Sequence, residues 1–272
     1  AEGWEWFKDE FRRSKRKYAI GLGDYNDFTR PTMRARMLQP LAHDEGTRHQ
    51  IDNMVRREQD KLLNRMAFLE GHCLGLHGGH HYWEFADGTN SDQRIATALG
   101  APYLGWMAST RLTIQMVTPG TKMKPSIHAF NIISMHGQAN ARKTGGKVAW
   151  MENNLVGAWL ANLYVMGHAC ASGSWVPHEI NTIRSRGDPG YETLVPRCLM
   201  VGGFHKGYTD GWGSYVERAA FPPQPVMWGV LRLRHRNTRA GAAMNGVSRP
   251  RSEFLDVEAV NRGPGAPIIR IR

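Results

Sequence analysis

Residues 73–83 read CLGLHGGHHYW, a short apolar run that passes directly into glycines and histidines. An apolar run of this length, bounded by glycine, predicts a buried strand that ends in a sharp turn. The segment YAIGLGD, residues 18–24, has the same design and predicts a strand that ends at Asp24. In open α/β sheets, ligands bind beyond the carboxyl ends of the strands. Both segments therefore place polar side chains where chemistry is expected.

Two later strands are predicted to end in the same way. SIHAFNIISMHG (126–137) ends at His136, and NLYVMGHAC (162–170) ends at His168. A further alternating segment, 110–118, also predicts a strand. Apolar residues at helical spacing predict helices over 4–16, 46–69, 92–100 and 150–161, with Gly100 at the end of the third. This order of strands and helices indicates the α/β class with a largely buried sheet.

The remaining third of the chain gives weaker signals. Residues 194–205 and 225–235 predict strands that could form a second sheet layer, and the basic tail from 236 onward is rich in Gly, Arg and Pro and is expected at the surface. Neither a repeat nor a linker is evident. We therefore expect residues 1–272 to form a single domain, with the principal motifs within 15–175 and the second layer and tail within 176–272.

Composition narrows the classes of protein that the chain can belong to. Hydrophobic residues make up 41% of it, but no stretch approaches the roughly 20 apolar residues that span a bilayer. Three widely spaced cysteines do not suggest a disulfide framework, which favours a reducing, cytoplasmic location. The net charge of +11 favours contact with polyanions such as nucleic acid, although it also fits a role in solubility or an acidic partner.

Ligand-type side chains follow four predicted strands, each next to glycine, which lets the backbone approach an ion closely. Carboxylate and imidazole together suit Zn, Mn or Fe. The candidate metal ligands are Asp24, His80, His136 and His168. His77 or His81 could take the place of His80.

At these residues the chain resembles the calcineurin-like metallophosphoesterase family, in particular a phage or prophage branch. Family members carry, in order, D-x-H, GD, GNH, a lone His and GHxH, each at the end of a strand. The matching residues here are Gly23 and Asp24, then Gly79, His80 and His81, then His136, and finally Gly167 through Cys170. The resemblance implies a four-layer α/β/β/α sandwich and, for a phage-encoded protein, the cytoplasm of the host cell.

The departures from the family pattern fall mainly on one of its two metal sites. No D-x-H precedes Asp24, and Cys170 stands where the family has the second His of GHxH. The first site therefore keeps one of its four ligands, or two if Cys170 binds as a thiolate. The second site differs only by His80 in place of Asn. Either an upstream D-x-H completes two sites, or the chain is a one-metal or an inactive relative.

The resemblance also implies roles for individual residues in phosphate-ester hydrolysis. Asp24 would hold the metal that activates a water molecule, and His81 would protonate the leaving oxygen. Asn26 and Asp27 could orient these groups, and Arg142 and Lys143 could attract the phosphate of the substrate. The substrate would be a phosphodiester or phosphomonoester, and the basic charge favours a nuclease or phosphodiesterase.

Other readings stay open at this stage. The same fold could bind nucleic acid or a protein without catalysis, or its histidines could simply pack in the core. Cys170 is more readily explained as a small buried side chain than as a metal ligand. The tryptophans are expected in the core or at its rim, although one of them could stack on bases. This last group consists of Trp83, Trp106, Trp150 and Trp159.

Overall fold

The computed structural model describes residues 2–29, 31–37, 39, 44–116, 126–138, 141, 143–169, 171–183, 191–204, 217, 226–235 and 255–262. Contacts along the chain divide it into two compact units. Unit 1 comprises Ala1–Ala108 and Ser134–Gln138, and unit 2 comprises Ser109–Ile133 and Ala139–Arg272. The chain therefore returns to unit 1 for one short segment that contains His136. The expectation of a single domain stays a prediction.

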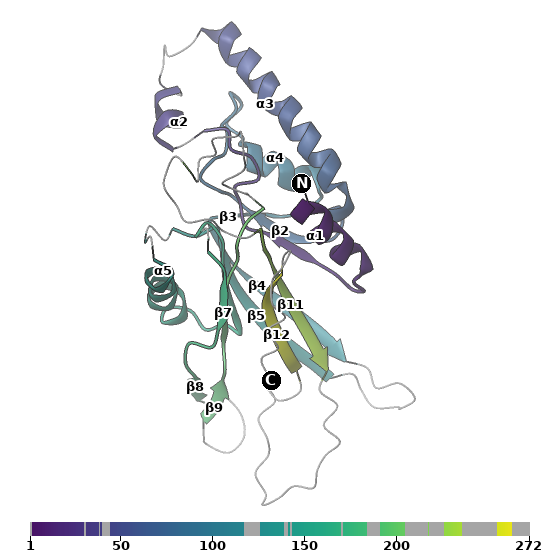
Figure 1. Ribbon diagram of the computed structural model, residues 1–272, viewed down its shortest axis with the longest axis vertical. Coiled ribbons are helices and arrows are strands. Elements are labelled where there is room, and N and C mark those ends of the chain that lie inside the picture. The colour runs from purple at the N-terminus through teal and green to yellow at the C-terminus, as the bar shows by residue number, and fades with distance from the viewer. Residues whose placement is uncertain are drawn as a thin grey trace, which may run out of the picture. The chain divides into compact units, whose positions relative to one another are not determined.

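Unit 1 is built on a three-stranded parallel sheet in the order β1-β2-β3. Parallel neighbours require crossover connections, and helices supply them here. Figure 1 shows α3 as the long blue helix. The strands are β1 (Ala19–Gly21), β2 (Cys73–His77) and β3 (Tyr103–Gly105). The helices are α1 (Glu2–Arg13), α2 (Pro31–Met37), α3 (Glu45–Met66), the short 3-10 turn η1 (Ala67–Leu69) and α4 (Ser91–Ala98).

The core of unit 1 joins helices α1, α3 and α4 to the central strand β2. Phe11, Met66, Leu76 and Ile95 come from these four elements and are at most 7% exposed. Burying an aliphatic or aromatic side chain of this kind stabilises a fold by about 1.5–3 kcal/mol. This core fixes the sheet edge at which β1 and β2 end.

The start of α4 is defined by a reciprocal pair of hydrogen bonds. The side chain of Asn90 accepts a hydrogen bond from the Gln93 amide, and the side chain of Gln93 accepts one from the Asn90 amide. Such a capping box satisfies two backbone donors that a helix otherwise leaves open. At the other end, Gly100 has a φ of 64°, as expected for a residue that ends a helix.

Unit 2 contains most of a five-stranded sheet in the order β4-β5-β6-β10-β7. Within it, β10 runs parallel to β6 and antiparallel to β7. The strands are β4 (Met107–Met116), β5 (Ser126–Met135), β6 (Leu163–Met166), β7 (Gly173–Trp175) and β10 (Arg197–Met200). Two antiparallel pairs, β8 (Ile180–Ile183) with β9 (Tyr191–Leu194) and β11 (Trp228–His235) with β12 (Leu255–Arg262), complete the unit's described strands.

The α/β class expected from the sequence is confirmed, and β1, β2, β4, β5 and β6 lie where strands were predicted, with somewhat different ends. The helix expected at 150–161 is wrong in its bounds. It begins as α5 (Thr144–Met151), continues as the π-helical turn η2 (Glu152–Val156) and then stops. The pair Gly145–Gly146 in its first turn weakens the helical signal in the sequence. The prediction for the tail also missed β12.

Several described elements gave no sequence signal at all, namely α2, β3 and β7 to β9. They are short, and short elements rarely show a clear period. Among the helices of the described residues, none combines the length and the apolar character needed to cross a membrane.

Candidate metal centre

Asp24 lies in the loop that follows β1, and its carboxylate is fixed by backbone amides. Its Oδ1 accepts hydrogen bonds from the amides of His80 (2.6 Å) and His81 (3.1 Å), which lie in the loop after β2. Its φ is 54°, a left-handed conformation that non-glycine residues seldom adopt. Such strain persists only where the surrounding structure imposes it, and it is concentrated at functional sites. Two parallel strand ends thus meet at this carboxylate.

Glycines allow these loops to meet. A Cβ at Gly79 would overlap the backbone nitrogen and Oδ1 of Asp24. A Cβ at Gly23, whose φ is 91°, would lie 2.6 Å from Nδ1 of His136. Real Cβ atoms essentially never come this close to other atoms. A side chain at Gly79 would therefore displace Asp24, and a side chain at Gly23 would displace His136.

His136 follows β5 within the short segment of unit 1 that comes late in the chain. Its ring is 2% exposed, and its Nδ1 lies 2.5 Å from the carbonyl oxygen of Leu22. A carbonyl can only accept a hydrogen bond, so Nδ1 carries the proton and donates it. Nε2 is therefore the ring nitrogen that remains for a metal ion. A hydrogen bond of this kind is the usual way in which proteins orient a metal-binding histidine.

The other nitrogen of the same ring faces the carboxylate. Nε2 of His136 lies 3.3 Å from Oδ2 of Asp24. Two lone pairs at this distance repel each other unless a positive charge is shared between them, either a proton or a metal ion. Carboxylate and imidazole are together a ligand set for Zn, Mn or Fe. The pair therefore fits a divalent cation.

His80 brings a second imidazole to the same place. Its ring centroid lies 4.7 Å from those of both His136 and Trp106. Its backbone is held from behind by the buried guanidinium of Arg34 on α2, whose Nη1 donates to the carbonyls of His80 (3.1 Å) and Tyr82 (2.9 Å). This clamp fixes the loop after β2.

His168 belongs to unit 2, where it follows β6. The amide of Ala169 donates to the carbonyl of Gly167, so His168 is the central residue of a tight turn with a φ of 55°. This turn is the strained form of the three-residue turn. The buried Lys147 on α5 anchors it by donating to the carbonyl of Ala169. Among the described residues, only Arg16 shares a positive φ with Asp24 and His168 outside glycine.

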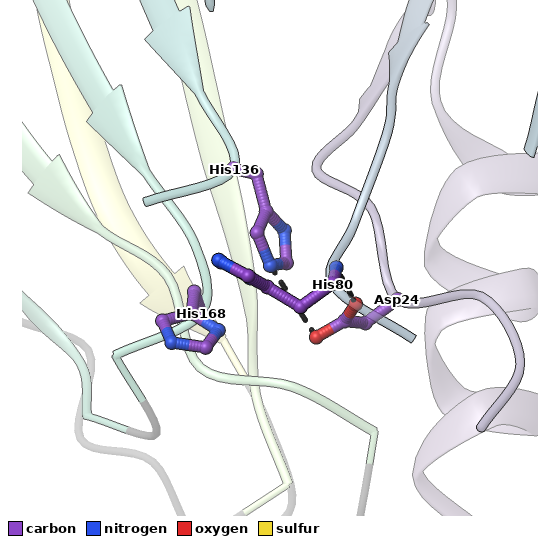
Figure 2. A group of neighbouring side chains, drawn as sticks. All are labelled: Asp24, His80, His136 and His168. Atoms are coloured by element: carbon purple, nitrogen blue, oxygen red, sulfur yellow. Dashed lines mark hydrogen bonds and ion pairs between the residues drawn. The ribbon is translucent and has the colours of Figure 1, made fainter. Parts of the chain in front are cut away.

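These four residues form a group that could hold a metal ion. Each offers one ligand atom, and these atoms lie within 4.8 Å of one another. Figure 2 draws the side chains of Asp24, His80, His136 and His168. Three of them belong to unit 1 and are held together by hydrogen bonds within that unit. The sequence had named these four residues, together with Cys170, as candidate ligands.

Two neighbouring histidines differ in their role. His77, at the end of β2, is fully buried; its ring nitrogens contact the carbonyl of Gly105 (3.0 Å) and the hydroxyl of Ser134 (2.8 Å). Burial lowers its pKa, so it is a neutral core residue rather than an alternative ligand. His81 is partly exposed, and its Nδ1 lies 2.7 Å from Oδ1 of Asp27. The carboxylate expected to orient the site thus contacts the candidate proton donor.

A second carboxylate, Asp92 at the start of α4, lies behind the ligand loops. Its Oδ2 accepts a hydrogen bond from the amide of Gly79 (2.7 Å). Burial raises the pKa of Asp92 to about 6, and the charge of Asp24 raises it as well, whereas the Gly79 amide lowers it. Asp92 therefore supports the same loop as Asp24 while the two negative charges oppose each other.

The remaining predicted site residues are Lys143, Arg142 and Cys170. Lys143 is exposed at the residue before α5, in unit 2. Cys170 and Arg142 lie outside the described residues. Sequence reasoning missed Arg34, whose helix gave no sequence signal. The sequence marked Trp106 only as one of several aromatic residues. The residues around Trp106 do not distinguish it from the other tryptophans.

The chain was compared with protein-family models, with curated proteins and with solved structures, and none of the three comparisons found a match.

Proposed function

We propose that the protein is a metal-dependent phosphoesterase that hydrolyses a phosphodiester. The ligand set supports this proposal, since one carboxylate and three imidazoles fit one divalent ion such as Mn, Zn or Fe. The order of the ligands along the chain supports it further, because they follow β1, β2, β5 and β6 as in metallophosphoesterases. We propose for the whole chain the four-layer α/β/β/α arrangement of that family.

Each residue of the group would have a defined task. Asp24, His80, His136 and His168 would bind the ion. A divalent ion bound there would polarise the phosphate and lower the pKa of a water molecule. In hydrolysis the water oxygen forms a bond to phosphorus, the ester P–O bond breaks, and the leaving oxygen takes up a proton. The hydrogen bonds to the backbone of the ligand loops would keep the ligands in position during the reaction.

His81 is the candidate donor of that proton. Its Nδ1 lies 2.7 Å from Oδ1 of Asp27, and this contact fixes the orientation of the ring. The opposite nitrogen, Nε2, is then the atom that would donate to the leaving oxygen. Proton transfer by a positioned side chain contributes typically about 10²–10⁴-fold to the rate.

One observation carries the proposal most directly, namely the 3.3 Å separation between Asp24 Oδ2 and His136 Nε2, with Nδ1 of the same ring held by Leu22. A histidine that merely packs in the core needs no carboxylate at its second nitrogen. His77 shows the difference, because a carbonyl and a hydroxyl satisfy its ring.

The test combines metal content with turnover. The purified chain is loaded with Mn²⁺ or Zn²⁺, dialysed and analysed by mass spectrometry for bound metal, and its hydrolysis of bis-p-nitrophenyl phosphate is measured. We expect about one ion per chain and turnover that is lost with Asp24→Asn, His136→Ala or His168→Ala. His49→Ala, at an exposed position on α3, is the matched control and should keep both properties.

Two results would overturn the proposal. Stoichiometric metal without turnover of any phosphate ester would indicate a binding protein that keeps the ligand set but not the catalysis. Absence of bound metal, with a stability that does not change when a chelator is added, would indicate that the histidines only pack.

A further inference from the structure

Trp106 is a large aromatic side chain that remains exposed beside the ligand residues. It lies between β3 and β4, and 48% of its surface is exposed. Its ring centroid is 4.7 Å from that of His80 and 5.9 Å from that of His136. Exposing an indole costs hydrophobic free energy, so an exposed tryptophan at a functional site is a candidate contact for a ligand.

The position of Trp106 is fixed by its backbone. Its carbonyl accepts a hydrogen bond from the amide of His136 (3.0 Å). The residue before it, Gly105, has a φ of 64°, and its carbonyl accepts hydrogen bonds from the amide of Gly78 (2.9 Å). The backbone of Trp106 therefore belongs to the same hydrogen-bonded framework as the loops that carry His80 and His136.

Two other aromatic side chains in the loop after β2, Tyr82 and Trp83, already contact other side chains. The guanidinium of Arg34 covers the ring of Tyr82 at 3.6 Å from its centroid. Trp83 is 1% exposed and its Nε1 donates to Asp52 (2.7 Å). Trp106 thus differs from these neighbours in having a surface still open to a planar partner.

We propose that Trp106 is a stacking surface for a nucleobase, and that the phosphate ester cleaved at the site is a nucleotide phosphodiester. This inference rests on the proposed function. Every base has a π-face, so a tryptophan stacks on bases with little regard to sequence. A base and its phosphates are joined through one sugar, so a base on Trp106 has a phosphate within reach of the neighbouring histidines. The net charge of +11 favours such a polyanion.

The first experiment compares two esters with the same leaving group. Thymidine 5′-(p-nitrophenyl phosphate) carries a base, whereas methyl p-nitrophenyl phosphate does not. We expect Trp106→Ala to lower kcat/KM for the thymidine ester by about 5- to 150-fold, which corresponds to the 1–3 kcal/mol of one stacked base. The loss for the methyl ester, which has no base to stack, should be much smaller. Trp106→Phe should restore most of the preference.

Trp159→Ala is the matched control, because Trp159 has a similar exposure of 46% but lies outside the ligand group. It should leave the rates for both esters unchanged. An equal loss for both esters in Trp106→Ala, or no loss for either, would overturn the inference while the phosphoesterase proposal stands.

Binding gives a readout that does not depend on turnover. The affinities of fluorescein-labelled oligo(dT) and of thymidine 5′-monophosphate are measured for the wild type, Trp106→Ala and Trp159→Ala. Weaker binding of the oligonucleotide alone in Trp106→Ala points to a single strand as the natural ligand, and weaker binding of both points to a nucleotide. Unchanged binding of both overturns the inference, even if the wild type hydrolyses no ester and the proposed function has failed.

Discussion

The carboxylate of Asp24 and the imidazole of His136 face each other at 3.3 Å, and each is held from behind by backbone groups. The amides of His80 and His81 donate hydrogen bonds to the Asp24 carboxylate. The carbonyl of Leu22 accepts one from the His136 ring. These backbone groups belong to the loops after β1 and β2. The two side chains are therefore oriented before any ligand arrives, which reduces the cost of binding a cation.

Metal binding should stabilise the fold measurably. An ion that binds the native state alone, at a hundred times its Kd, adds about 2.7 kcal/mol. For a chain of this size we expect the Tm to rise by about 5 °C or more with Mn²⁺ or Zn²⁺ and to fall with EDTA. Scanning calorimetry of the wild type and His136→Ala checks this. An equal metal-induced rise in the variant would contradict the assignment of His136.

Gly79→Ala should abolish metal binding, because the new Cβ would overlap the backbone nitrogen and Oδ1 of Asp24. The carboxylate would have to leave its two amide donors. Gly145→Ala is the matched control, since a Cβ there meets nothing within 4 Å. Bound metal and thermal melting are measured for both variants. Full metal occupancy in Gly79→Ala would show that the loop adapts, and the rigid-loop explanation would be wrong.

His81→Ala should slow catalysis according to the leaving group. We expect a loss of about 100-fold or more for an alkyl phosphate ester, whose leaving oxygen needs a proton. The loss should be much smaller for p-nitrophenyl esters, because p-nitrophenolate leaves without one. Asp27→Asn should give a weaker version of the same pattern with metal content unchanged. Equal losses for both leaving groups would argue against proton donation by His81.

Asp92 should make stability depend on pH. Its pKa is about 6 in the folded chain against an ordinary value of 3.8. Between about pH 4 and 6 the folded chain therefore binds more protons at this site than the unfolded chain. The free energy of unfolding should consequently fall as the pH rises.

Asp92→Asn removes the titrating carboxyl group and with it this pH dependence of stability. The side-chain oxygen of the asparagine can still accept a hydrogen bond from the Gly79 amide. In the variant, the free energy of unfolding should change less with pH. The pH-dependent part of the difference between the two proteins should be at most about 3 kcal/mol. Urea unfolding of both proteins in EDTA between about pH 4 and 7 measures the difference. Parallel profiles would mean that Asp92 titrates normally.

The strand ends could be predicted from the sequence because each combines an apolar run, a glycine and a ligand-type residue. The segments ending at Asp24 and His136 are examples, and the structure brings these two together. The sequence could not separate His77 from His80, since both follow apolar or glycine residues in the same segment. Only the burial of His77 against Gly105 and Ser134 distinguishes them.

Features that depend on distant contacts had no local signal. Arg34 lies on a seven-residue helix with mixed polarity, and its role depends on carbonyls more than forty positions away. The bounds of α5 were misplaced because two glycines lie in its first turn, while the buried Lys147 anchors it to Ala169. Tertiary contacts here override local propensity.

The interrupted path of unit 1 limits how the protein can be dissected. Residues 134–138, which carry His136, belong to the same compact body as residues 1–108, although 25 positions of the other unit, Ser109–Ile133, come between them. A recombinant fragment that stops after residue 108 would lose both His136 and the hydroxyl that contacts His77. A minimal version for biophysical work would instead need residues 134–138 joined to position 108 through a designed loop.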